Sequence, residues 1–316
     1  MAAMTRRLVP WSLGLAALAP ASSLAGPGDL AAPEPAPKAI HGGLDAATCQ
    51  FPAAVAMLDQ ASESLFCTGS LVHPQVVLLA AHCIDPNYSW ATPGYAAFGE
   101  HADAPAFKVP VERCGFHPKW MNQDFDLAAC VLAEPVDGVP IVPLLMGCEA
   151  DQLAPGSEVT IVGFGADHAV YEGGEVIAEG AGPKRYTTQI VTELLPEWLD
   201  ILMVGQGSGG CFGDSGGPAM LQLADGSWRV LGAASTIHPD APEDDELCDY
   251  GTVYDMYWPE IAWLEWYTET DLTPCHTSDG GWDPGPGCGS FPLSPQVPAS
   301  GWGELCATPD LGGLSA

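Results

Sequence analysis

The chain has 316 residues, 47% of them hydrophobic, so it is long enough to bury one or two substantial cores. Asp and Glu number 40 against 9 Lys and Arg, which gives a net charge of −31. A surface this acidic repels nucleic acid and anionic membranes, so we expect neither as a partner. Solubility is the simplest interpretation of the charge. Adaptation to salty surroundings and attraction of basic substrates are alternatives that a salt titration of activity tests.

Residues 1–25 have the pattern of a secretory signal peptide. Arg6 and Arg7 supply positive charge, Leu8–Ala19 a short apolar stretch, and Ser23 to Ala25 a small-residue cleavage site. The apolar stretch is too short for a membrane anchor. We therefore expect a secreted protein, extracellular or periplasmic.

Residues 26–39 are rich in Pro, Ala and Gly, which is typical of a flexible propeptide. From Ile40 onward, short apolar runs alternate with turn signals, and this pattern predicts an all-β body. The expected strands are Ala53–Leu58, Gly69–Val72, Val76–Ala81, Leu127–Leu132, Val159–Phe164 and Val230–Ala234.

A single helix is expected at Pro259–Thr268, where the strand pattern ends. Proline suits the first turn of a helix, and the large apolar residues of this segment recur at the spacing of one helical face. Those residues are Ile261, Trp263, Leu264 and Tyr267.

The segment 272–316 is rich in Gly, Pro and Ser, and we expect a tail that is either a small disulfide-clipped appendage or a disordered linker. The whole chain has 11 cysteines, in agreement with export, because disulfides persist in oxidising compartments. The odd number leaves at least one cysteine unpaired or bonded to another molecule.

The sequence Cys-Phe-Gly-Asp-Ser-Gly-Gly-Pro at 211–218 carries the first catalytic signal. Glycines around Ser215 allow its hydroxyl and the nearby backbone N–H groups to approach a substrate closely. A serine hydroxyl is a weak nucleophile at its ordinary pKa, so this interpretation requires a neighbouring base.

The candidate base is His82, which follows the apolar run Val76–Ala81 and precedes a cysteine. A strand end followed by a disulfide would hold the imidazole firmly. A triad also needs an acid to fix the imidazole tautomer. Asp126 heads a buried strand and is preferred for this role, with Asp124 as the competitor.

Three stretches, AAHC at 80–83, DLA at 126–128 and GDSGGP at 213–218, resemble the signatures of the chymotrypsin/trypsin family in their order and spacing. The resemblance covers residues 40–271. It implies two six-stranded antiparallel β-barrels with a C-terminal helix. His82 and Asp126 would come from the first barrel and Ser215 from the second, on either side of a cleft.

The resemblance also implies the mechanism. Ser215 attacks the scissile carbonyl while His82 removes its proton, an acyl-enzyme forms, and the backbone N–H groups of Gly213 and Ser215 hold the oxyanion. The expected substrates are proteins or peptides. We expect no cofactor, no required metal and a monomeric enzyme.

Activation by cleavage is a further implication of the resemblance. Ile40 begins a stretch similar to the family's mature N-terminus. Cleavage of the Ala39–Ile40 bond would free an amine that pairs with Asp214, so the uncut chain would be a zymogen. Alanine at position 39 favours an elastase-like activator or self-cleavage over a trypsin-like one.

The resemblance pairs Cys67 with Cys83 and Cys211 with Cys248. Cys114–Cys130 is a further expected bridge, between two neighbouring strands around Asp126. Five cysteines cannot be paired from the sequence. They are Cys49, Cys148, Cys275, Cys288 and Cys306.

By position in the family, Gly209 would floor the specificity pocket and Ser235 would pair with the substrate backbone. Ile237 and Thr252 would stand where two glycines commonly form the walls. Branched walls resemble elastase and predict cleavage after small aliphatic residues. The alternative is a broad, chymotrypsin-like apolar preference, since one methylene changes selectivity by only about 1–3 kcal/mol.

Two other functions remain as alternatives. One is a non-catalytic binding protein on a protease scaffold, which the presence of His82, Asp126 and Ser215 disfavours. The other is a serine hydrolase acting on an ester or a different acyl group, which substrate profiling would distinguish.

Overall fold

The computed structural model describes residues 40–123, 125–172, 175–241, 247–289, 291–292, 302 and 311–312. The chain divides into residues 1–36 and residues 37–316, and every described residue belongs to the second unit. The predicted signal peptide (1–25), the predicted propeptide (26–39) and Asp124 therefore lie outside the described residues.

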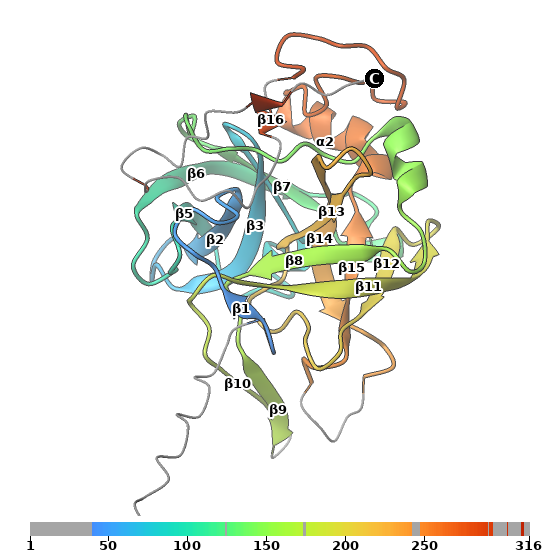
Figure 1. Cartoon of the computed structure of the whole chain (residues 1–316). Helices are drawn as coiled ribbons and strands as arrows, with labels where there is room; N and C mark the ends of the chain where they lie inside the picture. The colour runs from blue at the N-terminus through green and yellow to red at the C-terminus, as the bar shows by residue number, and fades with distance from the viewer. Residues whose placement is uncertain are drawn as a thin grey trace, which may run out of the picture. The chain divides into compact units, whose positions relative to one another are not determined.

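Six antiparallel strands close the first barrel (Figure 1). Apolar runs such as VVLL in β4 are buried along their whole length, whereas β6 alternates between more and less exposed residues, as expected for a strand with one face toward solvent. The strands follow one another around the barrel as β2 (Ala54–Asp59), β3 (Leu65–His73), β4 (Val76–Leu79), β7 (Ala128–Leu132), β6 (Phe107–Phe116) and β5 (Pro93–Phe98).

A second antiparallel sheet closes through the pairing of β11 with β8, and the short strand β1 (Leu44–Asp45) is added to the edge of β11. One continuous cluster of buried apolar side chains includes residues of both barrels. The barrel strands are β8 (Glu158–Gly163), β11 (Arg185–Leu195), β12 (Asp200–Val204), β15 (Gly251–Met256), β14 (Trp228–Ile237) and β13 (Pro218–Gln222).

The fold class predicted from the sequence is confirmed: two six-stranded antiparallel barrels are followed by a C-terminal helix. Helix α2 (Ile261–Thr268) follows a 3₁₀ turn at Trp258–Glu260 and buries Ile261 and Leu264, two of the predicted face residues. Among the described residues, no helix has the length and apolar character needed to span a bilayer.

The remaining elements are short. A hairpin of β9 (His168–Glu172) and β10 (Glu175–Glu179), which the sequence patterns did not predict, lies outside both barrels. Helix α1 (Trp120–Gln123) and 3₁₀ turns at Ala81–Cys83 and Gly147–Gln152 complete the body. In the tail, β16 (Phe291–Pro292) pairs with β17 (Leu311–Gly312).

Disulfides Cys67–Cys83, Cys114–Cys130 and Cys211–Cys248 are all present in the structure. The tail contains a fourth bridge, Cys275–Cys288, which the sequence could not assign. Cys49 is also disulfide-bonded, and Cys148 is an exposed free thiol.

Candidate active site

The imidazole of His82 is presented by a 3₁₀ turn, Ala81–Cys83, that directly follows β4. The disulfide from Cys83 to Cys67 on β3 ties this turn to the neighbouring strand. The side chain of His82 is 26% exposed, so one edge of the ring reaches the cleft while its base is fixed.

Asp126 lies just before β7 and holds this imidazole. His82 donates from ring Nδ1 to Oδ2 of Asp126 at 2.6 Å and from its backbone N–H to Oδ1 at 2.8 Å. The Asp126 side chain is only 3% exposed. Because an ionised carboxylate only accepts hydrogen bonds, the ring proton is on Nδ1 and the lone pair of Nε2 is free to accept a proton. Asp126, the aspartate preferred from the sequence, therefore contacts His82, and the competitor Asp124 lies outside the described residues.

Ser215 lies in the loop between β12 and β13. Its carbonyl accepts a hydrogen bond from the Thr68 backbone N–H of β3 at 2.9 Å, and the next N–H, of Gly216, donates to Ala234 of β14 at 2.7 Å. The serine loop is thus bonded to both barrels. Cys211–Cys248 links the start of this loop to the segment before β15.

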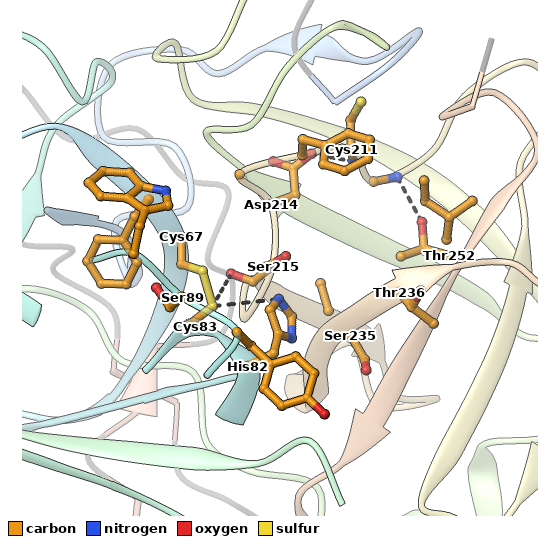
Figure 2. Close-up of a pocket in the computed structure, with 18 residues that line it drawn as sticks. Cys67, His82, Cys83, Ser89, Cys211, Asp214, Ser215, Ser235, Thr236 and Thr252 are labelled. Atoms are coloured by element: carbon orange, nitrogen blue, oxygen red, sulfur yellow. Dashed lines mark hydrogen bonds between the residues drawn. A yellow bond between two sulfur atoms is a disulfide. The ribbon is translucent and has the colours of Figure 1, made fainter. Parts of the chain in front are cut away.

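His82 and Ser215 line the same cleft, of about 460 Å³ (Figure 2). Within the described part of the chain, no hydrogen bond joins the Ser215 hydroxyl to the imidazole. Catalytic hydrogen bonds are often long without substrate and tighten when it binds. The arrangement is therefore compatible with proton transfer from Ser215 to Nε2 of His82.

The backbone at the serine loop has the conformation needed for an anion site. Gly213 adopts a φ of +100°, and a Cβ there would lie 3.0 Å from the Cα of Gly165, so only glycine fits without strain. The carbonyl of Gly213 is held by the Thr68 hydroxyl at 2.9 Å. The N–H groups of Gly213 and Ser215 donate to no other described residue, which leaves both for a ligand in the cleft.

Asp214 is buried beneath this loop. Its two carboxylate oxygens accept the backbone N–H groups of Gly165 at 2.7 Å and Cys211 at 2.8 Å. A Cβ on Gly163 would come within 2.0 Å of the same carboxylate. Only glycine at position 163 therefore leaves room for the Asp214 side chain. Burial raises the pKa of Asp214 to about 7, against the opposing effect of these hydrogen bonds and of the charge on Arg185.

Ile40, the predicted partner of Asp214, is fully buried. In the full-length chain its nitrogen belongs to the Ala39–Ile40 peptide bond, the bond that the predicted activation would cleave. The carbonyl of Ile40 accepts the Gly43 N–H, and the next residue, His41, forms a bridge with Gly209.

Three of the four predicted specificity residues line the cleft, namely Ser235, Ile237 and Thr252. Gly209 does not, because it faces His41, and its neighbour Gly210 takes that place in the cleft wall. The Gly210 N–H donates to Thr252 Oγ1 at 2.8 Å. The threonine side chain thus lies directly against the glycine.

Four aromatic residues of the cleft were not predicted from the sequence. They are Phe66, Tyr88, Trp90 and Phe212, and all except Phe66 are exposed large hydrophobic residues. Tyr88 and Trp90 follow His82 closely in the sequence, and this proximity was an available signal. Asp255, a buried carboxyl that accepts the backbone N–H of Asp126, was not predicted either.

A cluster of potential metal-binding atoms also occurs here, formed by Cys67, His82 and Cys83. The two cysteines are bonded to each other. A disulfide offers no thiolate, so this cluster is not a suitable metal site.

Two antiparallel barrels with an Asp–His pair and a glycine-flanked serine define the chymotrypsin-like class. The chain belongs to the trypsin family: the family model described as Trypsin matches residues 40–249. The chain is 30% identical over 181 residues to chymotrypsin-C of Mus musculus and 31% identical over 182 residues to that of Rattus norvegicus. Each match spans 54% of this chain and 66% of the relative.

A more distant relative agrees with this assignment, and a solved structure agrees with the fold. Vitamin K-dependent protein C of Rattus norvegicus is 24% identical over 230 residues, which are 67% of this chain and 47% of the relative. A mutant of human heparin binding protein matches with a TM-score of 0.57 at 20% identity, covering 73% of this chain and 97% of that one. At that identity the structural match supports the fold alone.

Proposed function

We propose that the protein is a serine endopeptidase in which Ser215 is the nucleophile, His82 the general base and Asp126 the residue that orients the imidazole. The observation that carries the proposal is the pair of hydrogen bonds, at 2.6 and 2.8 Å, from His82 to Asp126 at the edge of the cleft that contains Ser215. The N–H groups of Gly213 and Ser215 form the oxyanion hole, and an acyl-enzyme is the intermediate.

The substrate residue before the scissile bond is small and aliphatic in this proposal. Ile237 and Thr252 both line the cleft, and Thr252 lies against the backbone of Gly210. Two β-branched side chains leave less space than two glycines, so a large aromatic or basic side chain fits poorly. No acidic side chain other than the buried Asp214 lines the cleft among the described residues, which gives a basic substrate residue no exposed partner.

The protein is secreted as a zymogen and activated at Ala39–Ile40. Four described disulfides are compatible with export. The buried carboxyl of Asp214 has hydrogen bonds but no hydrogen-bonded cation among the described residues. An α-amino group freed at Ile40 would supply that cation, and its pairing with Asp214 would organise the serine loop.

The test is hydrolysis of a peptide library by the secreted protein, combined with N-terminal sequencing of the active species. We expect cleavage chiefly after Ala or Val by a chain that starts at Ile40, and no cleavage by Ser215→Ala. Cleavage chiefly after Phe, Tyr or Arg would contradict the proposed pocket. Equal activity of the Ser215→Ala variant would contradict the mechanism.

A further inference from the structure

A second buried carboxyl group lies directly behind Asp126. Asp255 is in β15, is 1% exposed, and accepts the backbone N–H of Asp126 through Oδ2 at 2.6 Å. Every residue of β15 is buried, and Asp255 is its single charged residue. A carboxyl in such a strand has a high desolvation cost unless its protonation or its partners compensate.

The groups around Asp255 are acids and hydroxyls. Asp126 approaches from the first barrel, with His82 beyond it, and Asp200 is its direct partner on β12. The hydroxyl of Ser235 reaches it from β14, and Tyr257 follows two residues later. Within the described residues, Asp255 forms no ion pair with Lys, Arg or His.

These surroundings favour a protonated Asp255. Burial raises its pKa well above the ordinary value, and the nearby charges of Asp126 and Asp200 raise it further, against the lowering effect of the hydrogen bonds from the Asp126 backbone and the Ser235 side chain. Ionising both of two buried carboxyl groups that interact with each other is costly. Since Asp126 is paired with His82 at 2.6 Å, the proton belongs on Asp255.

The hydrogen-bond capacity of Ser235 leads to the same assignment. Its hydroxyl has a single proton, which it donates to Oδ2 of Asp126 at 2.7 Å. The Asp255 carboxyl lies near the same hydroxyl. Because Ser235 already donates its proton to Asp126, a hydrogen bond between Ser235 and Asp255 would take its proton from Asp255.

We propose that Asp255 is a positioning residue that acts as a neutral carboxylic acid. It accepts the Asp126 N–H and donates to Ser235 Oγ, which in turn donates to the Asp126 carboxylate. These linked hydrogen bonds hold the Asp126 carboxylate toward His82 Nδ1, because they fix both the backbone and the side chain of Asp126. The inference rests on the proposed function, since it assigns the second layer of that same catalytic site.

The decisive comparison is between Asp255→Asn and Asp255→Leu in the activated enzyme. An asparagine amide can accept from Asp126 and donate to Ser235, so we expect kcat/KM within about threefold of wild type. Leucine fills similar space without either hydrogen bond, and we expect kcat/KM to fall about 10- to 100-fold, as for other small misplacements of catalytic groups. Unchanged kcat/KM in a folded Asp255→Leu variant would overturn the positioning role.

The pH profile tests the neutral state. If Asp255 is neutral, Asp255→Asn changes no charge beside Asp126 and should leave the pH profile of kcat/KM in place. If Asp255 is ionised, the variant removes a buried negative charge near the imidazole and should shift the acidic limb of that profile to lower pH, which would overturn the assignment.

Infrared spectroscopy gives a readout that does not depend on activity. We expect the carbonyl band of a protonated carboxylic acid in the Ser215→Ala/Asp214→Asn protein near neutral pH, and its loss when Asp255→Asn is added, since Asp214 can no longer contribute a band of its own. Absence of such a band would overturn the proposal even if the enzyme is active. If the band is present but the wild-type protein has no peptidase activity, Asp255 is neutral as proposed and it is the proposed function that is refuted.

Discussion

Ser235 donates a hydrogen bond from Oγ to Asp126 Oδ2 at 2.7 Å, so a side chain of the second barrel fixes the carboxylate beside His82. The same carboxylate accepts both the imidazole and the backbone N–H of His82 from the first barrel. The geometry at His82 therefore depends on the contact between the two barrels as well as on each barrel's own fold.

The direction of the hydrogen bond between Asp126 and His82 sets the first prediction. In Asp126→Asn, the amide N–H₂ can donate to Nδ1, which places the ring proton on Nε2 and leaves no acceptor for the Ser215 proton. We expect kcat to fall by about 10⁴-fold with KM little changed, measured with a peptide substrate. Adding Ser215→Ala should cost about a further 10²-fold, far less than the roughly 10⁶-fold cost of Ser215→Ala alone, because residues that act as a unit are not additive. Additive losses would contradict a shared mechanism.

The conformation of Gly213 sets the second prediction. In Gly213→Ala, the positive φ and the contact with Gly165 both oppose the side chain, so the loop must shift and the oxyanion N–H groups with it. We expect kcat to fall about 10²- to 10³-fold. Gly226→Ala is the matched control, since its φ is +88° with nothing within 4 Å of the added Cβ. It should lose some thermal stability but no activity, and a similar kcat loss in both variants would refute the assignment.

The raised pKa of Asp214, about 7, predicts how the uncut chain responds to pH. Between about pH 4 and 7 the folded chain holds a proton at Asp214 that the unfolded chain has lost. The free energy of unfolding should therefore decrease as pH rises through this window. Urea unfolding of the uncut Ser215→Ala chain at a series of pH values measures this free energy. The same chain with Asp214→Asn is the control, and its free energy of unfolding should lack the decrease that Asp214 causes. Parallel pH profiles for the two proteins would contradict a raised pKa of Asp214.

Cleavage should remove that pH dependence. Ala39→Arg makes the proposed activation site cleavable by trypsin, so one preparation can be compared before and after the cut. We expect activity to appear only after cleavage. The freed amine of Ile40 should lower the pKa of Asp214, so stability after the cut should no longer decrease between about pH 4 and 7. Full activity of the uncut chain would rule out the zymogen.

The walls of the cleft set the last prediction. In Ile237→Gly the wall is open, and we expect kcat/KM for substrates with Phe before the scissile bond to rise about 10- to 200-fold relative to Ala substrates. Thr252→Gly should act in the same direction but also lower stability, because the Gly210 N–H loses its partner. An unchanged Phe-to-Ala ratio in both variants would show that these residues do not limit the pocket.

Much of the fold was predictable from local patterns. The apolar runs are strands because they are short, rich in branched residues and bounded by turns, and β4 ends at Leu79 where the chain enters the His82 turn. The β9–β10 hairpin was not predicted, because its strands are partly exposed and carry no long apolar run. The partner of Cys275 was not predictable either, since spacing alone leaves many connectivities open.

The site was predictable where one motif fixes the chemistry and unpredictable where distant segments meet. Ser215 and His82 stand in long, specific motifs, whereas Asp255 is one acid in a strand, and its contact with Asp126 spans 129 residues. Trp302 is a similar case, since its indole N–H donates to both carboxylate oxygens of Glu100, at 2.7 and 2.9 Å. Nothing local to either residue indicates such a partner.

Covalent labelling of the activated protein with a fluorophosphonate, followed by mass spectrometry of the modified peptide, tests the role of Ser215 as nucleophile. We expect one label per chain, on Ser215, with labelling abolished in Ser215→Ala and strongly slowed in His82→Ala. No label on Ser215, or equal labelling in the presence and absence of His82, would contradict a serine nucleophile activated by this histidine.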